Sequence, residues 1–413
     1  MRKIIGSIDI GSDEIKLIIA EIFNREVNVL CALSEKTVGF KAGVITNEEN
    51  FIKTVKMLIN NASEKLGFKI KKLIANIPTS SNDFLISEAT NTITSEDGIV
   101  TSNDILRILQ TVAYNKVKIN DELLAVIPIS FRVDEAEEAS PIGKKGSNLA
   151  CKAVLVSAAK SEIYEMLHVL EKCGLEIVDV TATGLVDYYN FKNEKYDTQT
   201  GIMVNIGDTK TSLSVFSKGI YINNEVLNVG GALITQDIGY IYKLNKSEAK
   251  LVKEELALAS IRRANPKETV RLINSEKNEL VINQYELTEI VASRLLEILK
   301  KVKNSINHLT KKEISYIIIT GGLTELKDFP LALASVFGET AHLGNINTVG
   351  IRNNKYSVAL GMIRYFNEKL KLRHREYSTI SELDADAMCN VDSRVLIASD
   401  SILGKVFGYF FDN

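Results

Sequence analysis

The sequence of 413 residues has little of several residue types, and each shortage excludes something. It has no tryptophan, and its five prolines leave no proline-rich tether between domains. Its four cysteines form no Cys-x-x-Cys pair and have no histidine at ligand spacing, so we expect neither a disulfide framework nor a structural zinc site. A charge excess is absent too, since 50 basic residues balance 52 acidic ones; this argues against a nucleic-acid partner.

Long apolar runs are also missing. No stretch reaches the roughly 18 apolar residues that span a bilayer. The N-terminus begins with basic residues and an apolar run, as a signal peptide does, but Asp9, Asp13 and Glu14 interrupt the run, so we expect no export. A hydrophobic content of 45% is, however, enough for two ordinary domains inside the cell.

One pattern occurs twice along the chain. Residues 4–32 alternate as strands around a turn at Gly11, and the same strand, glycine turn and strand return from Gly201. Aligned on the turns, Asp9 corresponds to Asn205 and Gly11 to Gly207. The repeat predicts an internal duplication with one α/β domain in each half.

The segments outside this repeat predict other combinations of helices and strands. Residues 83–159 combine a helix at 101–114 with two strands and predict an α+β insert, after which a helix and a strand rejoin the first domain. Helices are expected at 246–264 and 287–309, and an apolar strand at 315–320 ends in two glycines. We expect residues 358–367 to close the second domain and the polar stretch from 368 to act as a tether.

The first turn has the chemistry of a phosphate site. Gly11 and Ser12 can offer backbone N–H groups and a hydroxyl to a phosphate without an obstructing Cβ. Lys16 on the returning strand can place an ammonium against the same phosphate. Asp9 can hold a hydrated Mg²⁺, which needs only one or two carboxylates.

The second turn offers the same backbone but has Asn205, a poor general base, in place of the carboxylate. A third motif, Gly321–Gly322, can leave bare backbone for a nucleoside. The sequence has neither a GxxxxGK phosphate loop nor GxGxxG, so P-loop and Rossmann modes are not supported.

The order of these three motifs resembles the superfamily of actin, sugar kinases and heat-shock chaperones. Within it, the chain resembles the bacterial FtsA family of cell division proteins along nearly its whole length. The stretches that match are SIDIGSDEIK, VGFKAGVI, LLAVIPISFRVDE, PIGKKG, VGGALITQDIG, ASRLLEILKKVK, IIITGGLTELKDF and NKYSVALGM.

The resemblance implies an α/β actin-like fold: two duplicated RNase H-like domains flank a nucleotide cleft, with an inserted α+β subdomain and a C-terminal amphipathic helix. It also implies ATP and Mg²⁺ as cofactors, assembly with copies of itself into filaments, and tethering of FtsZ polymers, through the FtsZ C-terminal peptide, to cytoplasmic membrane lipid at the septum. The boundaries expected on this basis are 1–82 with 160–198, 83–159, 199–235 with 310–367, 236–309, a linker at 368–397 and the membrane helix at 398–413.

Carried over motif by motif, the resemblance also implies the site residues. Lys250 stands where the family usually has the Glu that contacts the ribose. GDTKTS replaces the usual GGGTTD and loses glycines and a carboxylate, so we expect ATP binding with weak or no hydrolysis. The residues implied for the nucleotide are Asp9 (also for the metal), Gly11, Ser12, Lys16, Asn205, Gly207, Thr211, Gly230, Gly231, Lys250, Lys253, Gly321 and Gly322.

Two surfaces complete the expectations. On the helix at 287–309, Arg294 and Lys303 match the region where the family receives the acidic FtsZ peptide. Near the C-terminus, apolar residues recur at one-face helical spacing, which favours insertion into a membrane interface over docking on the protein's own core. These residues are Ile402, Leu403, Val406, Phe407 and Phe410.

Two other functions fit parts of the pattern. A small-molecule kinase of the same superfamily would need a further carboxylate as a base, whereas the second turn has lost one. A pilus-assembly ATPase-like scaffold would share the hairpins and the insert, but the amphipathic C-terminus argues against it.

Overall fold

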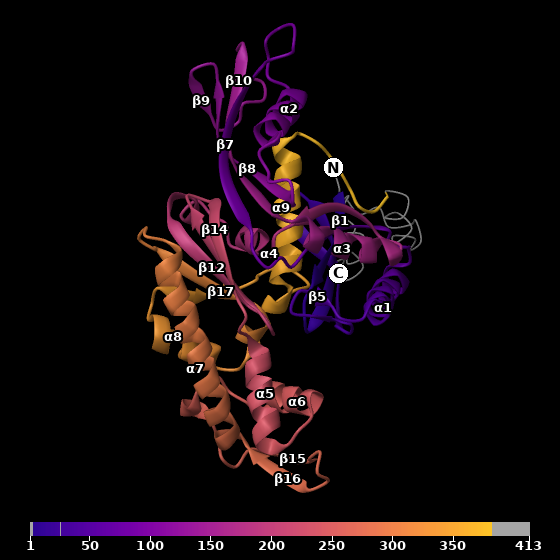
Figure 1. Ribbon diagram of the computed structural model, residues 1–413, viewed down its shortest axis with the longest axis vertical. Coiled ribbons are helices and arrows are strands. Elements are labelled where there is room, and N and C mark those ends of the chain that lie inside the picture. The colour runs from indigo at the N-terminus through magenta and orange to yellow at the C-terminus, as the bar shows by residue number, and fades with distance from the viewer. Residues whose placement is uncertain (1–2, 25, 382–413) are drawn as a thin grey trace, which may run out of the picture.

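The computed structural model describes residues 3–24 and 26–381 (Figure 1). Two five-stranded sheets share one plan: three consecutive strands run antiparallel, and the first of them pairs on its other side with a parallel strand that is followed by a fifth. This repetition of the strand order confirms the predicted duplication. The first sheet has the order β11(Glu176–Thr181)-β6(Lys72–Asn76)-β1(Lys3–Ile10)-β2(Glu14–Phe23)-β3(Glu26–Lys36), and the second has β14(Ile220–Leu227)-β13(Thr211–Ser217)-β12(Thr200–Ile206)-β17(Tyr316–Thr320)-β18(Ala341–Leu343).

Local sequence explains the helices on the first sheet. Helix α1 (Glu48–Leu66) begins where the side chain of Asn47 accepts a hydrogen bond from the N–H of Asn50, and it ends at Gly67, whose φ of 78° suits a residue without Cβ. Its buried face, which includes Phe51 and Val55, recurs at helical spacing. The other elements of this half are β4 (Phe40–Lys41), β5 (Val44–Ile45), α3 (Lys160–Lys172) and α4 (Thr183–Asp187).

The predicted insert forms a body of its own, seen at the upper end of Figure 1. Its four strands have the order β7-β10-β8-β9, and one helix, α2, packs on them around a separate apolar core. A reciprocal pair of hydrogen bonds between Thr101 and Asp104 fixes the start of that helix. The elements are β7 (Asp83–Thr92), α2 (Ser102–Ala113), β8 (Asp121–Val133), β9 (Ala136–Glu138) and β10 (Asn148–Ala159).

The segment after the second sheet's hairpin is mostly helical, but it differs from the prediction. Helix α6 ends at Leu256 and not at Ala264, because Leu258 donates its N–H to the hydroxyl of Thr288 and the chain leaves the helical path there. A two-stranded hairpin that the sequence did not predict follows. The elements are α5 (Gly231–Tyr242), α6 (Lys246–Leu256), β15 (Thr269–Ile273), β16 (Glu279–Asn283), α7 (Gln284–Leu309) and α8 (Phe329–Phe337).

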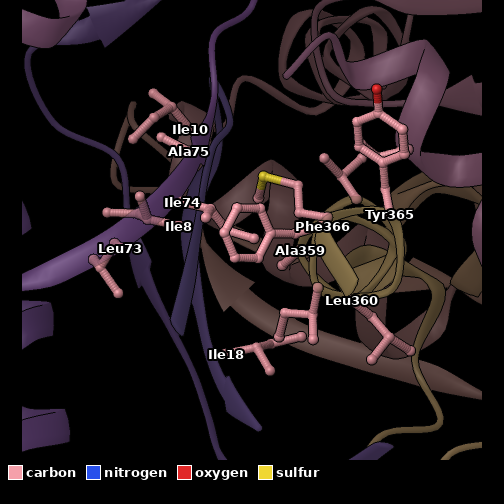
Figure 2. Packing of buried hydrophobic residues seen from close by; sticks show 14 of the residues in the cluster. Ile8, Ile10, Ile18, Leu73, Ile74, Ala75, Ala359, Leu360, Tyr365 and Phe366 are labelled. Atoms are coloured by element: carbon pink, nitrogen blue, oxygen red, sulfur yellow. The ribbon is translucent and has the colours of Figure 1, made fainter. Parts of the chain in front are cut away.

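The last described helix corrects a predicted boundary. Helix α9 (Ser357–Leu372) was assigned up to residue 367 to the second domain, but it packs against β1, β2 and β6 and belongs to the first core. Figure 2 shows its Ala359, Leu360 and Phe366 in the cluster that also contains Ile8 and Ile74. The sequence misled because α9 follows the second sheet along the chain yet returns to the first sheet in space.

The predicted linker also begins too early. Helix α9 continues to Leu372, and beyond it Thr379 accepts a hydrogen bond at 2.7 Å from the N–H of Gly6, while Ser378 pairs with Ile4. The chain up to Ile380, which is 4% exposed, is therefore anchored to the start of β1. The rest of the predicted linker, from residue 382, lies outside the described residues. None of the described helices is long and apolar enough to cross a bilayer.

Candidate functional site

The two predicted turns meet at one cleft of about 450 Å³. Each turn follows the central strand of its sheet: β1 leads into Gly11, and β12 into Gly207. The glycines after β17 approach the same cleft, because β17 pairs parallel with β12 and ends beside it. Of the predicted nucleotide residues, those that line the cleft are Asp9, Gly11, Ser12, Lys16, Asn205, Gly207, Gly231, Lys253 and Gly322.

Four predicted residues do not line the cleft. Thr211 is fully buried and its hydroxyl donates to the carbonyl of Val229. Gly230 packs under the second turn, where a Cβ would come within 2.5 Å of two carbonyl oxygens. Gly321, at φ 98°, turns the chain close against β12, and Lys250 points to an ion pair with Asp13. These four residues therefore hold the walls of the cleft in place and do not face its interior.

The first turn is held by charge and by close packing. The ammonium of Lys16 lies 3.2 Å from Asp9 Oδ2, because the two residues face each other across the hairpin. A Cβ on Gly11 would come within 2.5 Å of the carbonyl oxygen of Glu14, so only glycine fits this turn without a shift. The result is an open backbone turn at the cleft, with the ion pair of Asp9 and Lys16 beside it.

Gly322 leaves an open wall on the other side. A Cβ on it would meet no atom closer than 4.0 Å, so nothing covers its backbone where it lines the cleft. Nearby, the ammonium of Lys253 donates to the hydroxyl of Thr235 at 2.8 Å, and burial lowers the pKa of Lys253. A flat ring of a ligand can lie against Gly322 while a polar group of the same ligand contacts Lys253.

The second turn depends on a residue that the sequence analysis missed. Asn205 donates its amide N–H to Oδ2 of Asp187 at 2.7 Å, and Thr320 donates its hydroxyl to the same oxygen at 3.0 Å. Asp187 is 1% exposed and its other oxygen has no hydrogen-bond partner. Burial raises the pKa of Asp187. Its only signal in the sequence was a lone acid in the apolar stretch GLVDYY.

Three contacts join the halves at the rim of the cleft. The hydroxyl of Thr209 in the second turn donates to that of Ser12 in the first at 2.9 Å. Lys250 of α6 lies 2.6 Å from Asp13, and Lys355 lies 2.9 Å from Glu14. All three contacts end at residues 12–14, so a movement of the second half would displace the first turn.

The carboxylates suit a shared magnesium ion but do not enclose one. Asp9 lines the cleft, and Mg²⁺ is commonly bound by one or two carboxylates with phosphates and water. The described residues contain no group of three or more His, Cys, Asp or Glu side chains arranged for a metal. Magnesium would therefore have to share Asp9 with a phosphate-bearing ligand.

The predicted partner residues are already occupied within the chain. Arg294 on α7 donates to both oxygens of Asp237 at 2.6 and 3.0 Å, and Lys303 donates to the carbonyl of Val336. Beside Arg294 lies a hollow lined by Tyr240, which is 77% exposed. The residues predicted to contact the membrane, Ile402, Leu403, Val406, Phe407 and Phe410, lie outside the described residues.

Known proteins match this chain in sequence. The family model described as "Cell division protein FtsA" matches residues 202–361, and the one described as "SHS2 domain inserted in FTSA" matches 84–157, the insert. The protein named "Cell division protein FtsA" from Bacillus subtilis (strain 168) is 23% identical over 380 residues, which cover 90% of this chain and 85% of that protein.

Solved structures match the fold. A chain of the "PilM-PilN type IV pilus biogenesis complex" superimposes with a TM-score of 0.58 at 14% identity, covering 86% of this chain and 96% of that one. MreB5 of Spiroplasma citri bound to ADP does so with a TM-score of 0.54 at 12% identity, covering 90% of this chain and 98% of that one. These likenesses confirm the predicted actin-like fold class.

Proposed function

Because the chain belongs to the FtsA family of actin-like cell division proteins, we propose that it binds ATP, assembles into filaments and tethers FtsZ polymers to the cytoplasmic side of the cell membrane at the septum. The observation that carries the proposal is the cleft in which both glycine turns and the glycines after β17 meet. In a kinase of the same superfamily we would expect a cleft carboxylate free to act as a base. Here the strand end of the second turn has Asn205 in that place, and the acid that Asn205 contacts, Asp187, is buried behind it.

The nucleotide would act by joining the two halves. Its phosphates would contact the backbone of both turns, and Asp9 would share a hydrated Mg²⁺ with them. Ligands that contact both halves favour the closed arrangement over the open one. The rim contacts at residues 12–14 would pass that preference to the surfaces through which copies of the chain meet.

Membrane attachment would be collective. The terminal apolar face, with Leu403 and Phe407, is short and carries Asp400 and Asp412 beside it, so a single copy would bind weakly and mostly through apolar burial. A filament presents many such ends at once, and multivalency turns weak single anchors into firm attachment. Filament assembly and membrane binding should therefore strengthen each other.

The FtsZ peptide would bind at the hollow on α5 and α7. Tyr240 and Ile241 offer exposed apolar surface there, and Arg294 lies at its edge. An acidic peptide would have to share Arg294 with Asp237, which sets a modest affinity for each site. Many FtsZ tails on one polymer would compensate for this in the same collective way.

Lipid-monolayer electron microscopy of the full chain, with and without ATP, tests the proposal. We expect ATP-dependent filaments on the lipid, and we expect Phe407→Ser to remove them while the matched change Asp412→Asn leaves them in place. Filaments that persist in Phe407→Ser would contradict the anchor. If the full chain forms no filaments with ATP on any lipid, the scaffold function itself is wrong.

A further inference from the structure

Four lysines line the cleft, and three of them already have partners. Lys16 pairs with Asp9, and Lys355 pairs with Glu14. Lys253 is bound to Thr235 and, at 3.4 Å, to the carbonyl of Gly231. Within the described part of the chain, the ammonium of the fourth, Lys210, has neither an ion pair nor a hydrogen bond.

Lys210 reaches from one half of the molecule to the other. It belongs to the second turn, between β12 and β13, where its own carbonyl accepts the N–H of Gly207. Its ammonium lies against Gly43 in the β4–β5 hairpin of the first half, where a Cβ would be only 2.8 Å away. Gly43 has φ 91°, a conformation that favours glycine, and the absence of a Cβ there leaves room for the ammonium.

The surroundings of Lys210 identify the part of a ligand that it meets. The contact between Ser12 and Thr209, the residue before Lys210, marks the place where the two turns meet. Gly322, which follows β17, also lines the cleft but belongs to neither turn. A nucleotide with its base on Gly322 and its phosphates between the two turns would bring the far end of those phosphates to Lys210.

The charges explain why a free cation is needed there. Asp9, Asp13 and Asp208 all line the cleft and repel phosphate, while the ammonium of Lys16 is already 3.2 Å from Asp9. Lysine is a compact point charge that binds phosphate well. An unpaired ammonium that lines the cleft, on the turn that contacts the first one, is thus placed to receive the most highly charged part of the ligand.

We propose that Lys210 binds the terminal phosphate of the nucleotide and makes this chain prefer nucleoside triphosphates and diphosphates over monophosphates. The proposal rests on the function proposed above, since it takes the cleft to be the ATP site. It adds a phosphate-binding side chain, Lys210, which this chain has because GDTKTS replaces the usual GGGTTD. It also gives the second turn a positive charge where Asn205 has removed a negative one.

Calorimetric titration of the full chain with ATP, ADP and AMP in Mg²⁺ buffer tests this proposal. The variants are Lys210→Met and Lys210→Arg, with Lys53→Met, an exposed lysine on α1, as the matched control. Losing one charge-assisted hydrogen bond should weaken ATP binding about 10- to 100-fold in Lys210→Met. AMP binding should change less than about twofold, since AMP does not reach the lysine.

The outcomes separate the two proposals. Recovery of most ATP affinity in Lys210→Arg and unchanged binding in Lys53→Met would support the role of the charge. If Lys210→Met binds ATP as the unchanged chain does, or loses ATP and AMP equally, the assignment of Lys210 is wrong while the nucleotide site stands. If the unchanged chain binds no adenine nucleotide, both proposals fail. Thermal unfolding of each variant excludes a loss of folded protein.

Discussion

The two hairpin turns at the cleft have the same backbone plan and different charges. In the first, Asp9 faces Lys16 across the hairpin and the two form an ion pair. In the second, Asn205 takes the corresponding place, and the carboxylate that it contacts is that of Asp187 on α4, behind the strand. At the strand end of the second turn the cleft thus meets an amide in place of a carboxylate, and the acid that holds this amide is buried behind it. Strand topology survives such a change, whereas the chemistry facing a ligand does not.

The largest effect should come from making the second turn like the first. Asn205→Asp would place a carboxylate against that of Asp187 in a buried site, at a contact that is now 2.7 Å long. Two buried like charges without a cation should lower the free energy of unfolding by roughly 3 kcal/mol at neutral pH. Chemical denaturation of the variant measures this loss.

The double variant Asn205→Asp with Asp187→Asn provides the control. It returns to one carboxylate and one amide with their positions exchanged, so most of the lost stability should come back. If the double variant is as unstable as the single one, the repulsion between the two acids is not the cause. If Asn205→Asp alone is harmless, the buried carboxylate of Asp187 does not matter to the fold.

A second test compares the turn glycines. Gly11→Ala puts a methyl group 2.5 Å from the carbonyl of Glu14, whereas Gly207→Ala meets its nearest atom, the carbonyl of Lys210, at 3.0 Å. The first change forces the backbone to shift and should cost about 2 kcal/mol, while the second should cost about 1 kcal/mol or less. Thermal unfolding ranks the two variants. The reverse order would mean that the second turn is the more tightly packed.

A third test uses pH. Burial raises the pKa of Asp187 above the ordinary 3.8, so the folded state holds that proton more firmly than the unfolded state does. Its contribution to stability is complete below the unfolded value and is lost as the pH rises through the folded one. Asp187→Asn should therefore flatten the fall in unfolding free energy from about pH 4 upward. Parallel pH profiles for the variant and the unchanged chain would contradict this.

The smallest effect concerns the contact between the halves at Lys250. Its ion pair with Asp13 is partly exposed, so Lys250→Met should cost less than about 1 kcal/mol, and added salt should reduce the difference. Denaturant titrations at low and high salt measure both. A loss of several kcal/mol would show that the two turns are joined more firmly than their exposure indicates.

Much of the fold could be predicted from local pattern. Both hairpins, α1 and α7 follow from alternation or from helical spacing with polar caps, which depend on residues close along the chain. The β15–β16 hairpin was missed because five-residue strands that are largely exposed carry a weak pattern. The early end of α6 was missed because a side chain thirty residues away, that of Thr288, causes it.

The site divides in the same way. The glycines of both turns could be found because the backbone near a phosphate needs them, and that need is written locally in the sequence. Asp187 could not be found, because its meaning depends on Asn205 and Thr320, which come from two other strands. Gly230 and Thr211 pack behind the cleft, yet the sequence predicts that they bind the nucleotide. A sequence motif does not show which of its residues face a cleft and which pack behind it.

By itself, then, the sequence determined the repeated strand plan, the insert, and the glycine turns with their changed second motif, because hydrophobic period and the backbone freedom of glycine act over a few residues. Only the tertiary structure decided that α9 packs on the first sheet, that Asp187 stands behind Asn205, and that Lys210 is left unpaired at the cleft among the described residues. These features depend on which distant segments pack together, because that packing decides which side chains come close enough to pair.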